Sequence, residues 1–188
     1  MSTTATAIPG LVAGTWTIDL SHSEVSFVVR HLVVSKVRGS FRRFSGELQI
    51  SEDISASSAT ATIDMASVDT RDPARDDHLR SADYFDVERY PTMTFRSTGV
   101  RRHGERFVVS GDLEIHGVTR PVELTVEFNG VTPDPWGGTR AGFSATTEIN
   151  RRDFGIDLRI PLVGGGIAVG EEIKIQLEIQ AVLAGSGA

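Results

Sequence analysis

The residues best suited to covalent chemistry lie close together near the N-terminus. Asp19, Ser21 and His22 are the residue types of a nucleophilic hydrolase site, in which a histidine activates a serine hydroxyl. They fall within one turn-like stretch, and no G-x-S-x-G elbow or other activating context accompanies them. We therefore interpret them, with Ser23, as suppliers of turn and strand-end hydrogen bonds, and predict no catalytic residues.

Metal binding is the second possible chemistry, and the spacing of the ligands argues against it. The acidic residues of 69–77 lack the loop spacing of a calcium site and alternate with arginines, which is typical of surface ion pairs. No histidines form an i, i+4 pair or a short-spaced set; they are His22, His31, His78, His103 and His116. The chain has no cysteine, which excludes disulfides, thiolate metal sites and cysteine nucleophiles. We predict neither a metal nor a cofactor.

A cluster of cations could bind a phosphate. Lys36, Arg38, Arg42 and Arg43 are close in sequence and stand beside phenylalanines. At the mouth of a pocket they could hold a phosphate or pyrophosphate headgroup, since guanidinium groups pair well with phosphate oxygens. Arg38, Arg42 and Arg43 are the headgroup candidates, and a solvated turn is the alternative interpretation.

Strands are the elements that must position these residues. Apolar side chains fall on every second residue, most clearly at Ile173, Ile175, Leu177 and Ile179, which predicts strands with one dry face. The pattern predicts strands at 15–20, 24–32, 36–50, 59–65, 92–101, 106–116, 120–128, 139–149 and 171–183. Gly39 is a candidate bend or bulge within 36–50. So many strands share one interior by closing into a barrel or stacking as a sandwich.

The alternation is interrupted once, by a predicted helix over 73–82. Asp72 is a good N-cap and Pro73 suits the first helical turn. We expect His78 to attach this helix to the body of the protein by hydrogen bonds.

Composition limits the partners and the compartment. The 188 residues suit one domain, and the formal net charge is -6 with a pI of about 5.4. Nucleic acids and anionic membrane surfaces both favour a basic face, so neither is expected as a main partner. The sequence shows no signal-peptide pattern and no apolar stretch of about 20 residues, so we expect a cytoplasmic protein that does not span a membrane.

Four ordered blocks give the chain a specific resemblance. They are WTIDLSHSEVSFVVRHLVVSKVRGSFRRFSGEL, DTRDPARDDHLRSADYFDVERYPTMTFRST, VSGDLEIHGVTRPVEL and INRRDFGI. With them the chain resembles the YceI-like family of lipid-binding proteins. The resemblance implies an all-β, lipocalin-like antiparallel barrel of about eight strands with one short helix. It also implies that the barrel holds a long apolar chain, such as a polyisoprenoid, and that two copies pair as a homodimer.

We therefore divide the chain into a flexible tail, 1–13, and a single lipid-binding barrel domain, 14–185. Small inward residues such as Gly46, Ala61 and Ala145 leave room inside the barrel, although a packed core is the alternative. The candidate lining residues are Phe27, Val29, His31, Phe41, Phe44, Leu48, Ile63, Phe95, Phe107, Leu113 and Phe143.

The favoured function is a non-catalytic carrier of a polyisoprenoid, an isoprenoid quinone or a fatty chain. One alternative is an enzyme acting on a prenyl or fatty substrate, with His31 or an inward-facing acid as the proton-transfer group. The other is an interaction protein whose barrel is filled.

Overall fold

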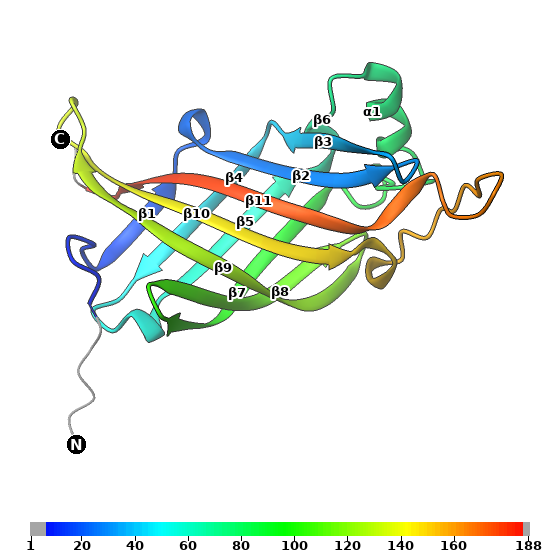
Figure 1. The fold of residues 1–188 in the computed structure, drawn as a ribbon. Helices are drawn as coiled ribbons and strands as arrows, with labels where there is room; N and C mark the ends of the chain where they lie inside the picture. The colour runs from blue at the N-terminus through cyan, green and yellow to red at the C-terminus, as the bar shows by residue number, and fades with distance from the viewer. Residues whose placement is uncertain (1–6, 186–188) are drawn as a thin grey trace.

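One continuous antiparallel sheet forms most of the molecule (Figure 1). The computed structural model describes residues 7–185. The strands are β1 (Gly14–Ile18), β2 (Glu24–His31), β3 (Ser35–Phe41), β4 (Phe44–Ile50), β5 (Ser58–Asp64), β6 (Val68–Asp69), β7 (Thr92–His103), β8 (Arg106–Ile115), β9 (Val118–Pro133), β10 (Thr139–Asn150) and β11 (Val169–Leu183). The helices are α1 (Pro73–Arg80) and the 3-10 turns η1 (Leu20–His22), η2 (Ile54–Ala56), η3 (Met65–Ser67) and η4 (Arg151–Phe154).

The sheet closes into a barrel through β1. The strand order is β1-β4-β5-β7-β8-β9-β10-β11, and β1 also pairs with β11, so these strands form a ring. The long strand β11 pairs with β1 near Ala181 and with β2 over Val169–Glu178. Strand β2 pairs in turn with β3, and β3 pairs with β6. The prediction of an all-β, lipocalin-like antiparallel barrel with one short helix is confirmed.

The predicted helix forms, and its ends follow from its capping residues. The Asp72 carboxylate accepts a hydrogen bond from the Arg75 backbone N–H at 3.1 Å, and Pro73 occupies the first turn. Helix α1 ends at Arg80, slightly before the predicted end. Asp76, which is buried, accepts hydrogen bonds from the Thr70 backbone N–H and hydroxyl at 2.9 and 2.6 Å, so it ties the helix to the end of β6.

The predicted strand 36–50 is two strands, β3 and β4. The chain turns at Arg42 and Arg43, where the Arg42 backbone N–H donates to the Ser67 carbonyl at 3.1 Å. The interpretation of Gly39 as a bend or bulge is wrong, because β2 and β3 stay in regular register through it. Gly39 pairs with Phe27, whose ring occupies the space that a side chain at position 39 would need.

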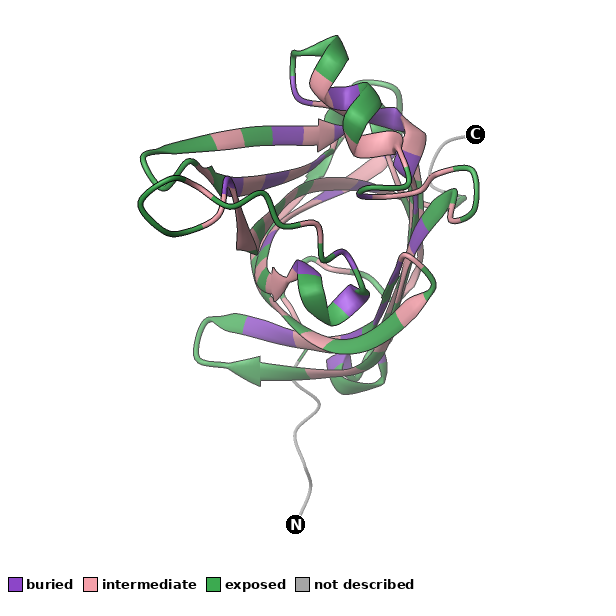
Figure 2. Cartoon of the chain, turned by 90° about the vertical axis from the view of Figure 1, so that its right-hand side faces the viewer, coloured by how far each residue is buried: buried purple, intermediate pink, exposed green. Residues whose placement is uncertain are grey.

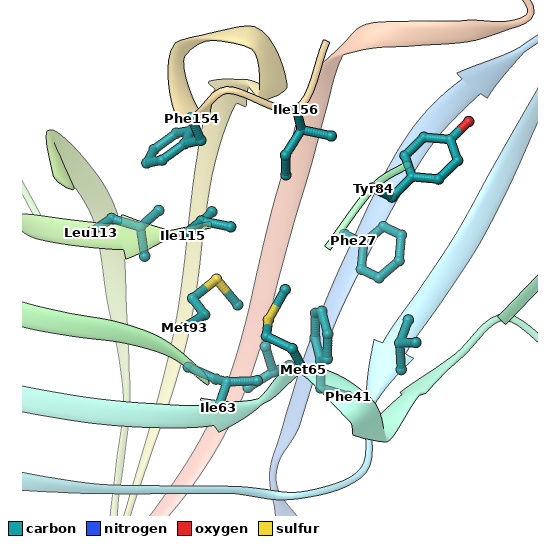
Figure 3. Close-up of a cluster of buried hydrophobic side chains, with 12 residues drawn as sticks. Phe27, Phe41, Ile63, Met65, Tyr84, Met93, Leu113, Ile115, Phe154 and Ile156 are labelled. Carbon is teal, nitrogen blue, oxygen red and sulfur yellow. The ribbon is translucent and has the colours of Figure 1, made fainter. Parts of the chain in front are cut away.

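Two clusters of buried side chains lie toward opposite ends of the barrel. The larger cluster lies beneath α1 and η4, and Figure 3 shows its main members. The smaller cluster surrounds Trp16, which is fully buried with Ala141 and Ala181 where β1 joins the barrel to β11. Within residues 7–185, no helix is long and apolar enough to cross a membrane.

Candidate functional site

An apolar cavity of about 190 Å³ lies between the two clusters, inside the barrel. Strands β4, β5 and β7 to β11 all contribute side chains to its wall. Its polar lining consists of small hydroxyl residues: Ser57, Ser58, Thr60 and Thr147. No titratable side chain of the described residues lines it. The cavity therefore offers contact to hydrocarbon and no acid or base for chemistry.

The exposure of the inward-facing residues shows that the interior is not filled. In β9 the residues alternate between exposed and partly exposed, and Val122, Leu124 and Val126 are partly exposed although they point into the cavity. In β11 the same is true of Ile175, Leu177 and Ile179. Side chains in a packed core are almost fully buried, so these strands line open space.

One end of the cavity is closed by a set of side chains that we call the plug: Phe27, Phe41, Met65, Tyr84 and Phe154. Figure 3 shows these side chains grouped around the end of the barrel. Ile63, Met93 and Leu113 belong both to this packed cluster and to the cavity wall, so the plug forms the floor of the cavity. Seen along the barrel, the short helical turn after β10 lies across this end (Figure 2).

A buried arginine holds the chain that covers the plug. The Arg151 guanidinium donates to the carbonyl oxygens of Ile156, Leu158, Gly170 and Val169 at 2.7, 2.9, 3.0 and 3.2 Å. Burial lowers the pKa of Arg151, and neutral carbonyls rather than carboxylates satisfy its donors. The arrangement ties the segment after η4 to the start of β11.

The other end of the cavity leads outward beneath the N-terminal segment. Ile8, Leu11, Ile50 and Ile54 line both the cavity and a second hollow of about 320 Å³, and we call these four residues the mouth. Ile8 and Leu11 belong to the segment predicted as a flexible tail, and the Leu11 backbone N–H donates to the Ile8 carbonyl at 3.1 Å. The pattern of alternating residues gave no signal for this contact.

A third hollow, a cleft of about 790 Å³, lies where the barrel wall divides. Strands β9 and β10 stay paired only as far as Thr125 and Thr146. Beyond that point β10 continues to Asn150 paired with β11 alone, so β9 and β10 separate. Charged and polar side chains line much of this cleft, including Arg120, Glu148 and Lys174. The cleft is larger than the barrel cavity, but its polarity makes it a poor site for hydrocarbon.

Most of the predicted lining residues contribute to the cavity wall. These are Phe44, Leu48, Ile63, Phe95, Phe107, Leu113 and Phe143. Phe27 and Phe41 lie in the plug, Val29 is buried on β2, and His31 is partly exposed at the end of β2. None of these last four lines the cavity. Ligand contact by any of the predicted residues stays a prediction.

Two arginines of the predicted cation cluster, Arg42 and Arg43, form ion pairs with carboxylates, whereas Arg38 forms none with the described residues. Arg42 Nε donates to Asp69 Oδ2 at 2.6 Å, and Arg43 Nε donates to Asp64 Oδ2 at 2.8 Å. Hydrogen bonds from the Arg71 backbone N–H and from Arg42 lower the pKa of Asp69. Arg38 is exposed on β3 with no carboxylate within 4 Å among the described residues. The headgroup role of Arg38, Arg42 and Arg43 stays a prediction, tested by prenyl pyrophosphate binding to Arg42→Ala plus Arg43→Ala.

Asp19, Ser21 and His22 contact one another as a capped turn. His22 Nδ1 lies 2.8 Å from Asp19 Oδ2 and 3.0 Å from Ser21 Oγ, whereas a catalytic histidine uses its two ring nitrogens for its two partners. Hydrogen bonds from Ser21, Arg140 and His22 hold the pKa of Asp19 well below its ordinary value. This geometry has the features of an N-cap rather than of a nucleophilic relay.

His78 was predicted to attach α1 to the barrel by hydrogen bonds, but the hydrogen bond of its ring is with the turn after the helix. His78 Nε2 lies 2.8 Å from Asp83 Oδ2, in the turn that follows α1. No group of three metal-ligating side chains occurs among residues 7–185.

Comparison with known proteins identifies the family to which the chain belongs. The model of the YceI-like domain matches residues 16–181. The chain belongs to the YceI-like family. A UPF0312 protein from Photorhabdus laumondii is 44% identical to this YceI-like protein over 146 residues, 76% of each chain. The predicted family resemblance is therefore confirmed.

Solved structures share the architecture of this YceI-like protein. BcnA from Burkholderia cenocepacia matches it with a TM-score of 0.75 at 27% identity, over 87% of this chain and 98% of BcnA. A polyisoprenoid binding domain from Saccharophagus degradans matches with a TM-score of 0.65 at 17% identity, over 92% of this chain and 99% of that domain. At 17% identity, the match to the Saccharophagus degradans domain shows a shared fold alone.

Proposed function

We propose that this YceI-like protein binds a long apolar lipid, such as a polyisoprenoid, with its tail in the barrel cavity and without catalysis. One observation supports this most directly: Val122, Leu124, Ile175 and their neighbours point inward yet stay partly exposed around an apolar cavity. Apolar surface that folding leaves unburied is available for burial by a ligand.

The energetics of an apolar tail suit a cavity without polar anchors. At about 0.8 kcal/mol per buried CH₂, a five-carbon isoprene unit contributes roughly 4 kcal/mol. Association costs on the order of 4–15 kcal/mol, so two to four buried units suffice. The cavity of 190 Å³ is smaller than ligand pockets of roughly 300–1,000 Å³. A longer tail would extend past Leu11 into the outer hollow, which leaves its headgroup at the mouth. In this binding mode the headgroup would not contact Arg38, Arg42 or Arg43, none of which lines either hollow.

Catalysis on the same lipid is the weaker alternative. A hydrolase or transferase acting on a tail in this cavity would need an acid or a base near the reacting atoms. Among residues 7–185, the polar side chains of the cavity wall carry hydroxyl groups and no acid or base, and His31, the predicted proton-transfer residue, lies outside the wall. Transport, the homodimer and the cytoplasmic location stay predictions.

Extraction of the purified protein with organic solvent, followed by mass spectrometry, tests the proposal. We expect a lipid with a long hydrocarbon tail in a stoichiometric amount. A solvent extract without lipid, together with no binding of added polyprenols, would refute the proposal. Conversion of an added lipid to a product would instead support the enzyme alternative.

A further inference from the structure

Exposed apolar side chains gather on two loops at the plug end of the barrel. Eight large hydrophobic residues are exposed among the described residues, and five of them lie on the β2–β3 turn and on the loop that precedes β11. We call these five residues the tip face: Leu32, Val33, Val34, Ile160 and Val163. Val34 is 86% exposed, and Val163 is as exposed as in an extended chain. Single exposed valines are common, but a group of this kind marks a binding surface.

Hydrogen bonds join the two loops into one structure. The Leu32 backbone N–H donates to the Ala168 carbonyl at 2.7 Å, and the Ala168 backbone N–H donates to the Ile160 carbonyl at 2.8 Å. Pro161 and Ile167 form an isolated bridge within the second loop. Both loops project beyond the barrel, as the end-on view shows (Figure 2). The tip face is thus a supported projection.

The backbone of the β2–β3 turn is strained in a way that displays its side chains. Leu32 and Val33 have φ angles of 51° and 64°, in the left-handed region. A β-branched residue such as valine rarely adopts this conformation, and residues held in it cluster at functional sites. A glycine or asparagine would form the turn with less strain, so the strain points to a use for the apolar side chains.

Three cations without ion pairs flank the tip face on the same hairpin. Arg30, Lys36 and Arg38 are exposed, and Arg30 lies directly across from Lys36 in the β2–β3 register. Among the described residues, no carboxylate lies within 4 Å of any of them. Arg159, on the second loop, is paired with Asp157 and Glu171 and adds no free charge. The hairpin therefore carries a local positive charge although the net charge of the chain is -6. The expectation from composition that anionic membranes are not partners rests on that net charge and does not describe this face.

We propose that the tip face docks on an anionic lipid bilayer. Its apolar side chains would enter the interface between headgroups, while Arg30, Lys36 and Arg38 pair with lipid phosphates. A narrow projection of this kind suits a soft surface, whereas a protein partner requires a broad complementary face. A second copy bound about a twofold axis would bring the same three cations close together, which is unfavourable. This inference is independent of the lipid in the cavity, because the tip face and the mouth lie at opposite ends.

Vesicle co-sedimentation tests the proposal. The protein is mixed with vesicles of phosphatidylcholine alone, or of phosphatidylcholine and phosphatidylglycerol in equal parts, at low and at physiological salt. We expect binding to the anionic vesicles, weakened by salt. The variant Arg30→Gln, Lys36→Gln, Arg38→Gln should lose about fivefold in partition coefficient for each cation, or roughly 100-fold in total. Val34→Asp plus Val163→Asp should also abolish binding.

The matched control removes the same charge from the opposite end of the barrel. It is Arg101→Gln, Arg102→Gln, Arg106→Gln on the β7–β8 hairpin, and it should bind like the unchanged protein. The proposal is overturned if the unchanged protein does not bind anionic vesicles. It is overturned as well if the control loses as much binding as the variant Arg30→Gln, Lys36→Gln, Arg38→Gln. It is also overturned if Val34→Asp plus Val163→Asp converts a dimer to a monomer in sedimentation velocity. Lipid extraction from the same variants tests the cavity separately.

Discussion

Ala61 offers a direct test of whether the cavity holds a lipid tail. It faces the cavity from β5, between Gly46 and Phe95 of the neighbouring strands, and is only partly buried. Ala61→Leu adds three carbon atoms to this space. A tail would lose the burial of about as many carbons, which at roughly 0.8 kcal/mol each is about 2.4 kcal/mol, or a factor of about 50 in affinity.

The same substitution should stabilise the protein without ligand. Filling a cavity commonly adds about 0.5–2 kcal/mol to the free energy of unfolding, so Tm should rise by a few degrees, roughly 2–4 °C for each kcal/mol. The assay combines thermal unfolding of the lipid-free protein with competition binding of polyprenols of increasing length. The preferred polyprenol should become shorter by about one isoprene unit, since that unit has five carbons.

Thr62→Leu is the control, because Thr62 is the exposed neighbour of Ala61 and does not line the cavity. It should change neither polyprenol affinity nor the preferred length. The reasoning fails if Ala61→Leu lowers stability while affinity is kept, since the space would then not be where the tail binds.

Three further predictions concern stability. Trp16→Ala should lower the free energy of unfolding by about 4 kcal/mol, because Trp16 is fully buried where the barrel closes. In thermal unfolding the Tm should fall by roughly 10 °C, and a Tm within about 2 °C of the unchanged protein would contradict this. Arg151→Met should cost on the order of 3 kcal/mol by leaving buried carbonyls without a donor, and hydrogen exchange should quicken first in residues 155–168 rather than uniformly. The pKa of Asp19 in the folded protein lies below its ordinary value of 3.8. The ionised Asp19 therefore stabilises the fold fully at pH values above 3.8, and this contribution is lost as the pH falls toward the folded-state pKa. In urea unfolding, the free energy of unfolding of Asp19→Asn should therefore lie below that of the unchanged protein by an amount that is constant near neutral pH and becomes smaller below about pH 4. A difference that does not depend on pH would refute the assignment.

The strands and the helix could be predicted because their signals are local. Alternation at Ile173–Ile179 reflects one dry face, and Asp72 with Pro73 reflects the needs of a helix start. The turn at Arg42 and Arg43 was missed because apolar alternation continues on both sides of it. Gly39 was misread because the close approach of the Phe27 ring is a contact between strands.

The candidate site was only partly predictable, for a geometric reason. Alternation shows that Phe41 and Phe44 have apolar surroundings, but it does not show how far along the barrel axis each one lies. That position depends on the stagger of the closed strands, which places Phe41 in the plug and Phe44 in the cavity wall. Leu11 reaches the mouth from a segment with no periodic pattern, and the division between β9 and β10 depends on where one ladder ends.

The plug has a consequence for how a lipid could be exchanged. With Phe27, Phe41 and Phe154 filling one end, a tail that enters at Leu11 must leave by the same route in reverse order. The terminal methyl groups would go in first and come out last, so any acceptor would always meet the polar end of the molecule. A hydrocarbon with bulky groups on both ends could not thread into the barrel at all, however well its middle suited the interior.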